Sequence, residues 1–359
     1  MRSVTKVIFA LPNMSSGGAE RVVSILANNM SRKNISVEIW LYYGFSLHYP
    51  LDSSVRIAFL DLSNLSTVNR ISAIHNRLRD EKKTKERIVF VPFLSAILKV
   101  SVIANLGIGI PLVACERNNP YIHGSKLHQR LWAQIPFLRA DHCVFQTPDA
   151  RAYYSLVSDN KCSVITNPIP KSSYSWNGSA SPQKLISVCR LHRQKNLPMT
   201  IDVIDRLKDV FPDIHLDIYG DGDLKESLEA EILKRGLSKH VALKGLTKEV
   251  PLRLANSSVF ISTSDYEGIS NSMLEAMSVG MPIVCTDCPI GGARLMLRGG
   301  AGVLTPIRDV NLFVSEVENL LNNPEQAIKL GQKAKEVSLQ YSAERITQMW
   351  LSVFDRLSS

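Results

Sequence analysis

Residues 259–279 have the sequence VFISTSDYEGISNSMLEAMSV, which joins two kinds of secondary structure. Residues 259–263 are rich in β-branched and apolar side chains, as in a buried strand. Residues 271–279 have the apolar spacing of a helix, and the turn between the two segments contains Gly268. A strand that leads through a glycine turn into a helix is the repeating unit of a parallel α/β sheet.

The same alternation extends along the rest of the chain. In the first half we expect strands at 4–10, 36–41, 88–91, 112–115, 143–146 and 164–166, with helices such as 19–30 between them. In the second half we expect strands at 184–189, 214–219, 241–244 and 259–263, and helices at 197–209, 223–235 and 271–279. The pattern predicts an α/β fold with two doubly wound, Rossmann-like parallel sheets that face a central cleft, where ligands lie beyond the carboxyl ends of the strands.

The alternation stops at 171–183, a stretch rich in Ser, Pro and Gly that predicts a linker. We therefore expect an N-terminal Rossmann-like domain at 1–170 and a C-terminal one at 184–340. Residues 341–359 contain a final helix, 343–357, whose apolar residues recur at helical spacing. We expect this helix to pack back across the domain boundary.

The composition agrees with two globular domains. The 359 residues correspond to about two domains of ~150 residues. A hydrophobic fraction of 45% and a charged fraction of 21% exclude a disordered chain and a multispanning membrane protein. Six scattered cysteines make no disulfide framework, and the first residues lack the pattern of a signal peptide, so we expect reduced thiols and a cytoplasmic protein.

The positive charge of the chain lies in its first half. Residues 1–180 contain 21 Lys and Arg against 11 Asp and Glu, hence +10, whereas residues 181–359 contain 21 against 22, hence −1. A basic half indicates an anionic partner such as a membrane surface or a phosphorylated lipid. We find no signature of a nucleic-acid-binding module, and solubility alone is the alternative explanation of the charge.

The turn and helix of the opening segment form the first candidate site. The backbone N–H groups of Gly268 to Asn271 would point outward at the carboxyl end of the strand and attract an anion. Glu267 lies in the turn and Glu275 in the helix, so one carboxylate can meet a sugar hydroxyl while the other accepts both hydroxyls of a ribose. A nucleotide sugar satisfies these features together. The alternative is a charge at a helix start and a solvated helical glutamate.

Two further turns are candidates. Arg190 and Lys195 flank the first strand-to-helix turn of the second domain, where a guanidinium fork and an ammonium suit a diphosphate. An exposed basic loop is the alternative. Gly17 and Gly18 follow the first expected strand of the first domain, and paired glycines let a ligand approach the backbone closely. The motif lacks the third glycine of a dinucleotide fingerprint, so a tight turn is the alternative there.

Three segments together resemble the retaining glycosyltransferases of family 4, which have the GT-B fold. They are GGAERVV at 17–23, RLHRQKN at 190–196 and EGISNSMLEAMSVGMPIV at 267–284. The resemblance covers nearly the whole chain and is densest at 184–304. The segments ERNNP at 116–120 and CPIG at 288–291 also resemble members that build bacterial surface glycans on lipid carriers.

The resemblance implies roles for individual residues. Arg190 and Lys195 match cations that bind the donor diphosphate. Glu275 matches the carboxylate that holds the ribose, and Glu267 matches the one that contacts the donor sugar. We expect catalytic roles for Arg190, Lys195 and Glu267. The other expected donor-binding residues are Gly17, Gly18, Gly268, Ile269, Ser270, Asn271 and Glu275. On the acceptor side the expected residues are Glu116, Arg117 and Asn118.

The sequence also departs from the family at three places. Cys189 stands where relatives usually carry glycine, and Ile269-Ser270 replaces a common aromatic-proline pair. Ala293 follows Gly292 where many relatives carry an acidic residue. These departures bear on the shape of the donor pocket and on the donor sugar rather than on the fold.

By resemblance we expect a retaining, metal-independent transferase that needs no cofactor. It would move a hexose or N-acetylhexosamine from a UDP-linked donor to a polyprenyl-diphosphate-linked glycan in bacterial surface polysaccharide assembly. It would be cytoplasmic, with peripheral contact to anionic lipids on the inner face of the cell membrane and no nucleic-acid partner. The alternatives are a non-catalytic GT-B subunit that partners another transferase, and a nucleotide-sugar epimerase.

Three other patterns allow two interpretations each. Asp221-Gly222-Asp223 resembles a metal-binding aspartate pair, but we interpret it as a turn. Cys285 and Cys288 have the spacing of a zinc motif without a second pair, which favours buried thiols. A basic amphipathic helix expected at 122–138 either lies on a membrane or turns its apolar face to the core, and we favour the core.

Overall fold

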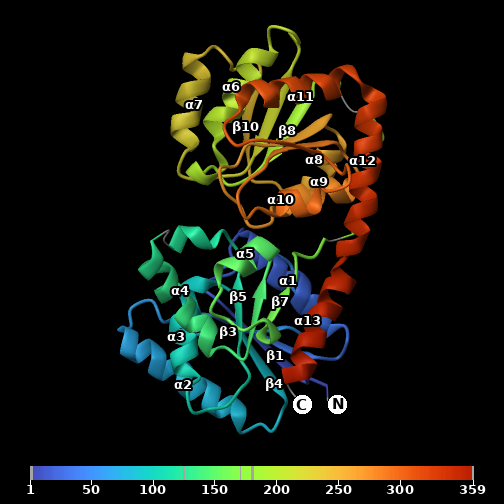
Figure 1. Cartoon of the computed structure of the whole chain (residues 1–359). Coiled ribbons are helices and arrows are strands. Elements are labelled where there is room, and N and C mark those ends of the chain that lie inside the picture. Colours follow the sequence, from blue (N-terminus) through green and yellow to red (C-terminus); the bar gives the residue numbers. More distant parts are fainter. Residues whose placement is uncertain (1–2, 124–125, 170, 179–181, 358–359) are drawn as a thin grey trace. The chain divides into compact units, whose positions relative to one another are not determined.

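A computed structural model describes residues 3–123, 126–169, 171–178 and 182–357 (Figure 1). Contacts divide the chain into two compact units. Unit 1 comprises residues 1–168 and 343–359, and unit 2 comprises residues 169–342. The chain therefore enters unit 2 at Ile169 and returns to unit 1 at Ala343.

Unit 1 is built on parallel strands. They are β1 (Lys6–Leu11), β2 (Ser36–Leu41), β3 (Arg56–Phe59), β4 (Ile88–Pro92), β5 (Val113–Glu116), β6 (His142–Phe145) and β7 (Cys162–Val164). The order is β3-β2-β1-β4 in one sheet and β5-β6-β7 in a second. Phe90 in β4 bridges to Leu112 beside β5, and its amide donates a 2.9 Å hydrogen bond to the carbonyl of Pro111, so the second sheet continues the first.

All helices of unit 1 except α13, the last element of the chain, lie between these strands in the sequence. The helices of unit 1 are α1 (Gly18–Ser31), α2 (Thr67–Lys82), α3 (Ser95–Ala104), α4 (Leu127–Arg139), α5 (Pro148–Tyr153) and α13 (Ala343–Leu357), with short 3-10 turns η1 (Pro120–His123) and η2 (Asp159–Lys161). Over the described part of the chain, no helix is both long and apolar enough to cross a bilayer.

Unit 2 contains a single parallel sheet with the order β10-β9-β8-β11-β12-β13. Its strands are β8 (Lys184–Val188), β9 (His215–Tyr219), β10 (Val241–Gly245), β11 (Val259–Ser262), β12 (Ile283–Thr286) and β13 (Val303–Thr305). Its helices are α6 (Leu197–Leu207), α7 (Lys225–Lys234), α8 (Val250–Ala255), α9 (Asn271–Val279), α10 (Gly292–Met296), α11 (Val310–Asn322) and α12 (Pro324–Ser338), with 3-10 turns η3 (Arg193–Lys195) and η4 (Leu339–Tyr341).

In both units the chain winds outward from a central strand in one direction and then in the other. The prediction of two doubly wound, Rossmann-like parallel sheets is therefore confirmed. The reversal of strand order falls between β1 and β4 in unit 1 and between β8 and β11 in unit 2. Open sheets bind ligands beyond the carboxyl ends of the strands at such a reversal.

Several elements differ from the sequence-based expectation, which also lacked β12 and β13. Strand β3 was not expected, because all four of its residues are exposed or half-buried and the strand therefore lacks a run of apolar side chains. The helix expected at 122–138 is wrong at its start, since α4 begins at Leu127 after η1. Residues 124–125 of that expected helix lie outside the described residues.

Part of the stretch expected to be a linker packs on unit 2. Trp176 donates from Nε1 to the carbonyl of Ser257 at 2.7 Å, and its amide donates to the carbonyl of Val279 at 2.7 Å. Residues 179–181 of that stretch lie outside the described residues. Trp176 thus fixes the segment 171–178 to the end of α9.

The last helix, α13, completes the core of unit 1. Trp350 is fully buried, and its ring lies 5.9 Å from Phe93 after β4 and 5.6 Å from Phe354. Next to Phe354, Asp355 accepts a 2.8 Å hydrogen bond from the amide of Val4. The helix also packs against α1.

Replacing Trp350 by Ala should destabilise the protein by about 3–5 kcal/mol, because it removes a large aromatic ring from a closed core. Met349 is the matched control, since it is the preceding residue on the same helix but is 39% exposed. Met349→Ala should cost less than about 1 kcal/mol. Thermal or urea unfolding of the two variants measures the difference, and equal losses would contradict the packing of α13.

Candidate functional site

The candidate site of unit 2 lies where its strand order reverses. Strands β8 and β11 are neighbours, with Leu185 opposite Val259 and Ile186 opposite Phe260. Both strands run in the same direction, so the loops that follow them leave the sheet at the same edge. The loop after β8 carries Arg190 and Lys195, and the loop after β11 carries Glu267.

Lys195 and Glu267 form an ion pair across these two loops. Their side chains are 17% and 15% exposed. Both carboxylate oxygens of Glu267 have further partners, because Oε1 accepts a 2.9 Å bond from the hydroxyl of Ser264 and Oε2 accepts a 3.2 Å bond from the side chain of Gln194. The structure thus brings two of the expected catalytic residues together and fixes the carboxylate in one orientation.

The pair keeps Lys195 charged. Burial alone lowers the pKa of a lysine, but the opposing charge of Glu267 outweighs burial and holds the pKa of Lys195 above its ordinary value. Lys195 is therefore an ammonium at every physiological pH. With three N–H donors, it can contact Glu267 and a phosphate oxygen at the same time.

Several other hydrogen bonds join the two loops. The hydroxyl of Thr263 donates to the carbonyls of Lys195 and Asn196 at 3.1 and 3.0 Å. The amide of Asp265 donates to the carbonyl of Gln194 at 2.9 Å, and the side chain of Asn196 donates to the Asp265 carboxylate at 3.0 Å. These contacts hold the Lys195–Glu267 pair without help from a ligand.

The conformation of the loop after β8 also requires a glycine at position 220, directly after the neighbouring strand β9. Gly220, which follows β9, has a φ of +145°, and a Cβ atom there would lie 1.8 Å from the carbonyl oxygen of Cys189. Any side chain at this position would push the loop away from the sheet. Asn196 ends the loop in the left-handed conformation, with φ +45°, before α6 begins.

Arg190 differs from Lys195 in its surroundings. Its side chain is exposed, and within the described residues no carboxylate lies in ion-pairing distance of its guanidinium. The structure places one cation in a fixed pair and leaves the other available at the same edge of the sheet. A guanidinium in this position can bind an oxyanion through two parallel N–H groups.

The first turn of α9 lies next to Glu267. Ser270 is the N-cap, and its hydroxyl accepts a bond from the amide of Met273. Gly268 accepts a 2.6 Å hydrogen bond from the amide of Gly292, which ties this turn to the start of α10. Ile269 is buried and fills the space above Gly292, where a Cβ atom would lie 2.2 Å from its Cγ1. The turn is therefore rigid on the side of the sheet, and Asn271 opens the helix.

Glu275 lies one helical turn further along α9. It is 3% exposed, so the interpretation as a solvated helical residue is wrong. A buried carboxylate has a large desolvation cost and is retained only where neighbouring groups compensate for it. Its burial distinguishes it from an ordinary surface glutamate.

The cysteines near this site are free thiols. Burial raises the pKa of Cys189, and it raises the pKa of Cys288 to about 12. Cys285 and Cys288 are both buried, which confirms the prediction of buried thiols, and Cys288 donates to the carbonyl of Ser264 at 2.9 Å. Across the described residues, no group of three or more His, Cys, Asp or Glu side chains could hold a metal ion.

Asp221 belongs to a turn, as interpreted from the sequence. Its side chain accepts a 2.9 Å bond from the amide of Gly222, and its carbonyl accepts one from the amide of Leu191. Gly222 has a φ of +156° and lies against the backbone of Leu191. The segment therefore supports the loop that carries the cations.

In unit 1, Gly17 and Gly18 lie at the start of α1. Gly17 is the N-cap and Gly18 is the first helical residue. A Cβ atom on Gly17 would lie 2.1 Å from Oε2 of Glu20, whose side chain is 8% exposed and folds back over the helix start. These atoms are the far end of a flexible side chain that can move aside, so packing against Glu20 does not by itself require glycine at position 17.

The expected acceptor-side residues lie at the carboxyl end of β5. Glu116 is 1% exposed: its Oε1 accepts from the amides of Arg117 and Asn118 at 3.0 and 3.1 Å, and its Oε2 accepts from the hydroxyl of Tyr154 at 2.6 Å. Asn118 is half-buried. Glu116 therefore shapes the loop that follows β5.

Arg117 is also buried. Its guanidinium lies 4.9 Å from the ring centroid of Phe93 and donates to Asn167 and to the carbonyl of Ile165. Burial lowers the pKa of Arg117 to about 10, which leaves it charged at neutral pH. Of the three acceptor-side residues, Asn118 is the most accessible.

Sequence reasoning did not identify Gln194, Ser264 or Asp265. Gln194 and Ser264 orient the Glu267 carboxylate, and Asp265 joins the two loops. Ser264 lies 3 positions before Glu267 on the same loop, whereas Gln194 and Asp265 have partners on the other loop, at sequence separations of 73 and 69. Only the pairing of β8 with β11 brings them together, and no local spacing indicates it.

Comparison with known proteins agrees with this geometry. Residues 173–337, nearly all of unit 2, match the family described as Glycosyl transferases group 1. An uncharacterized glycosyltransferase of Haemophilus influenzae is 24% identical over 353 residues, covering 97% of this chain and 99% of its own length.

Two further proteins resemble the whole chain. An α-1,4-N-acetyl-D-galactosaminyltransferase of Campylobacter jejuni, whose name includes GalNAc-α-(1→4)-GalNAc-α-(1→3)-diNAcBac-PP-undecaprenol, is 23% identical over 359 residues, covering 97% of this chain and 98% of its own. The crystal structure of a Staphylococcus aureus TarM variant with fondaparinux, α-GlcNAc-glycerol and UDP superposes with a TM-score of 0.81 at 14% identity, covering 98% of this chain and 100% of TarM.

The family match covers the unit that holds the Lys195–Glu267 pair, and the likeness in fold covers both units. The chain therefore has the GT-B fold, its residues 173–337 match the model of the group 1 glycosyltransferases, and relatives that align with its whole length are named glycosyltransferases.

Proposed function

We propose that this protein is a glycosyltransferase that moves a hexose or N-acetylhexosamine from a UDP-linked donor to a polyprenyl-diphosphate-linked glycan, with retention of configuration and without a metal ion. The reaction would serve the assembly of a bacterial surface polysaccharide. The enzyme would act in the cytoplasm, in peripheral contact with the inner face of the cell membrane.

The observation that carries this proposal is the arrangement of Arg190, Lys195 and Glu267 at the strand reversal of unit 2. A fixed ammonium, an available guanidinium and the amides that open α9 lie at one edge of one sheet. Breaking the bond between a sugar and a diphosphate places an additional negative charge on the leaving group. These groups can stabilise that charge without a divalent cation.

The donor and acceptor classes are proposed from the relatives. UDP is bound in the TarM structure, which has the same fold. The name of the Campylobacter relative includes a glycan on PP-undecaprenol. The net charge of +10 on residues 1–180 supports a lipid-linked, anionic acceptor for this chain.

The proposed mechanism follows from these residues. Arg190 and Lys195 bind the diphosphate, and Glu267 orients the Lys195 ammonium while its carboxylate faces the donor sugar. Glu275 holds the ribose. The acceptor hydroxyl attacks the anomeric carbon from the side of the leaving group, its proton passes to the departing phosphate oxygen, and the sugar–phosphate bond breaks as the new glycosidic bond forms.

Removing either cation should slow transfer. Arg190→Ala and Lys195→Ala should each lower kcat/KM by about 10²–10³, which corresponds to ~3–4 kcal/mol of transition-state stabilisation. Nucleotide release with and without an acceptor glycan measures the rate. Arg193→Ala is the control, because Arg193 lies exposed in the same loop and has no assigned role. Near-normal rates in both cation variants would contradict the assignment.

Metal removal should leave the reaction unchanged. Since side chains and backbone amides supply the positive charge, turnover in excess EDTA should stay within about twofold of turnover with added Mg²⁺ or Mn²⁺. Donor turnover after extensive dialysis against the chelator tests this. A loss that only a divalent cation restores would disprove metal independence.

Nucleotide binding should stabilise the protein selectively. At a concentration about one hundred times its dissociation constant, UDP should add ~2.7 kcal/mol of apparent stability. Thermal-shift measurements with UDP, GDP and ADP compare the nucleotides. The shift should shrink in Arg190→Ala and stay unchanged in Arg193→Ala. A larger shift in melting temperature with GDP or ADP than with UDP would mean that the donor sugar is linked to that nucleotide and not to UDP.

A further inference from the structure

Helix α4 of unit 1 presents an apolar face to solvent. Leu127 is 71% exposed and Trp132 is 67% exposed. Leu131, Ile135 and Leu138 are each more than 40% exposed. With Leu127, these three residues recur at helical spacing along one side of α4. The favoured sequence-based interpretation, in which this apolar face turns to the core, is therefore wrong.

The opposite face of α4 fixes this orientation. Gln134 is 2% exposed, accepts a 2.8 Å bond from the amide of Leu156 and donates to the carbonyl of Arg130 at 3.3 Å. The ring of Phe137 lies 4.1 Å from that of Tyr154. Turning the apolar side inward would break these contacts and expose Phe137. The outward apolar face is thus a consequence of packing on the inner side.

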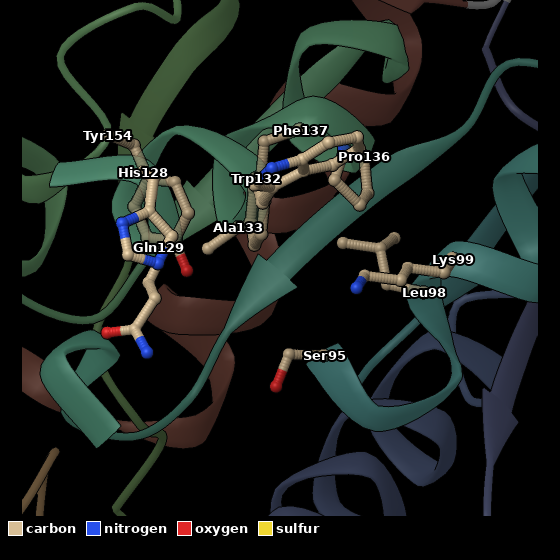
Figure 2. Close-up of a pocket in the computed structure, with 10 residues that line it drawn as sticks. All are labelled: Ser95, Leu98, Lys99, His128, Gln129, Trp132, Ala133, Pro136, Phe137 and Tyr154. Atoms are coloured by element: carbon tan, nitrogen blue, oxygen red, sulfur yellow. The ribbon is translucent and has the colours of Figure 1, made fainter. Parts of the chain in front are cut away.

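A cavity of about 290 Å³ lies beside this face, between α3 and α4 (Figure 2). Its walls include Leu98 of α3 and the side chains of Trp132, Pro136 and Phe137 of α4. Lys99 and His128 also line it. Along α4 the wall is polar at His128 and Gln129 in the first turn and apolar from Trp132 to Phe137, and Lys99 adds a cation on α3. An apolar wall beside a cation suits an acyl chain below an anionic headgroup.

The charge around α4 is positive. Between residues 88 and 140 the sequence contains five Lys and Arg and a single acidic residue, Glu116, which is buried. Lys99, Lys126 and Arg139 are exposed on α3, at the start of α4 and at its end. Exposed apolar side chains flanked by Lys and Arg favour the interface of an anionic bilayer, where each cation gains from the surface potential.

We propose that α4 and the adjoining rim of α3 form the surface by which this protein docks on an anionic lipid bilayer. Leu127, Leu131 and Trp132 enter the headgroup region, and Lys99, Lys126 and Arg139 contact the lipid phosphates. The proposal deepens the proposed function, on which it rests for the choice of a membrane as partner. It assigns membrane contact to α4 and the adjoining rim of α3.

Trp132 provides a direct probe of this contact. Of the four tryptophans in the sequence, Trp40 and Trp350 are fully buried and Trp176 is half-buried, so Trp132 is the exposed one. The full chain should bind phosphatidylglycerol-containing vesicles more tightly than phosphatidylcholine vesicles. Brominated lipids in the bound vesicles should quench its fluorescence, and Trp132→Phe should abolish most of that quenching. Binding without quenching of Trp132 would overturn the proposal.

A matched pair of variants separates this face from general hydrophobicity. Leu127→Glu should weaken vesicle binding roughly tenfold or more, and adding Leu131→Glu should weaken it further. Leu233→Glu is the control, because Leu233 is 73% exposed on a helix of unit 2 and should leave binding unchanged. Melting temperatures near that of the parent would show that the variants fold. Equal binding by Leu127→Glu and the parent would overturn the proposal.

Salt and self-association provide two further readouts. Raising the salt concentration from about 0.1 M to about 1 M shortens the Debye length from ~10 to ~3 Å and should weaken binding. Sedimentation should give the same oligomeric state for the parent chain and for Leu131→Glu. An oligomer of the parent chain that Leu131→Glu dissociates would identify a second copy of the chain as the occupant of this face and overturn the bilayer proposal.

The docking surface and the proposed function are tested by separate measurements. Vesicle binding is measured without donor or acceptor, whereas nucleotide release is measured on the parent chain in vesicle-free buffer. Nucleotide release without vesicle binding overturns only the docking surface. Vesicle binding without nucleotide release overturns only the transferase assignment.

Discussion

The ion pair between Lys195 and Glu267 is the interaction on which the site depends. It connects two loops that are far apart in the sequence and that only the pairing of β8 with β11 brings together. An ion pair with so little exposure stabilises a structure only if its geometry is good and its remaining hydrogen-bonding groups are satisfied. Ser264 and Gln194 donate hydrogen bonds to the carboxylate of Glu267. The strand order therefore brings the pair together, and the hydrogen-bonded pair in turn holds the two loops in place.

The pair also sets the charge balance of the site. Lys195 and Glu267 neutralise each other, so the protein does not bury a net charge when no ligand is bound. The available positive potential then comes from exposed Arg190 and from the amides at the start of α9. An incoming diphosphate would meet donors that are already oriented, and little reorganisation is needed when charge develops on it. Lys195 is thus held in place by its ion pair, whereas the exposed Arg190 can adjust its side chain to the ligand.

Much of the fold could be predicted from the sequence, because buried strands and amphipathic helices leave strong local patterns. The bounds of α9 and α13 agree with the predicted 271–279 and 343–357. Strand β3 left no such pattern, since it is short and exposed. The periodicity of α4 showed that one side is apolar but not which side faces the core. The contact between Gln134 and Leu156 decides that, and it joins residues 22 positions apart.

The candidate site was predictable only in part for the same reason. Motifs located Arg190, Lys195 and Glu267, but they did not show that two of these residues pair or that Gln194 and Asp265 support them. Motifs likewise located Glu116 and Arg117 without showing that both are buried in contacts within unit 1. Distances between loops depend on strand order, which local spacing does not contain.

The return of α13 to unit 1 affects how the chain folds during synthesis. Residues 1–168 emerge from the ribosome first, yet Phe93 and its neighbours lack the ring of Trp350 until all of unit 2 has been made. Domains usually fold in order from the N-terminus as they emerge. Here the first domain would stay incomplete, with an apolar groove exposed to chaperones, and the second domain would close its core sooner.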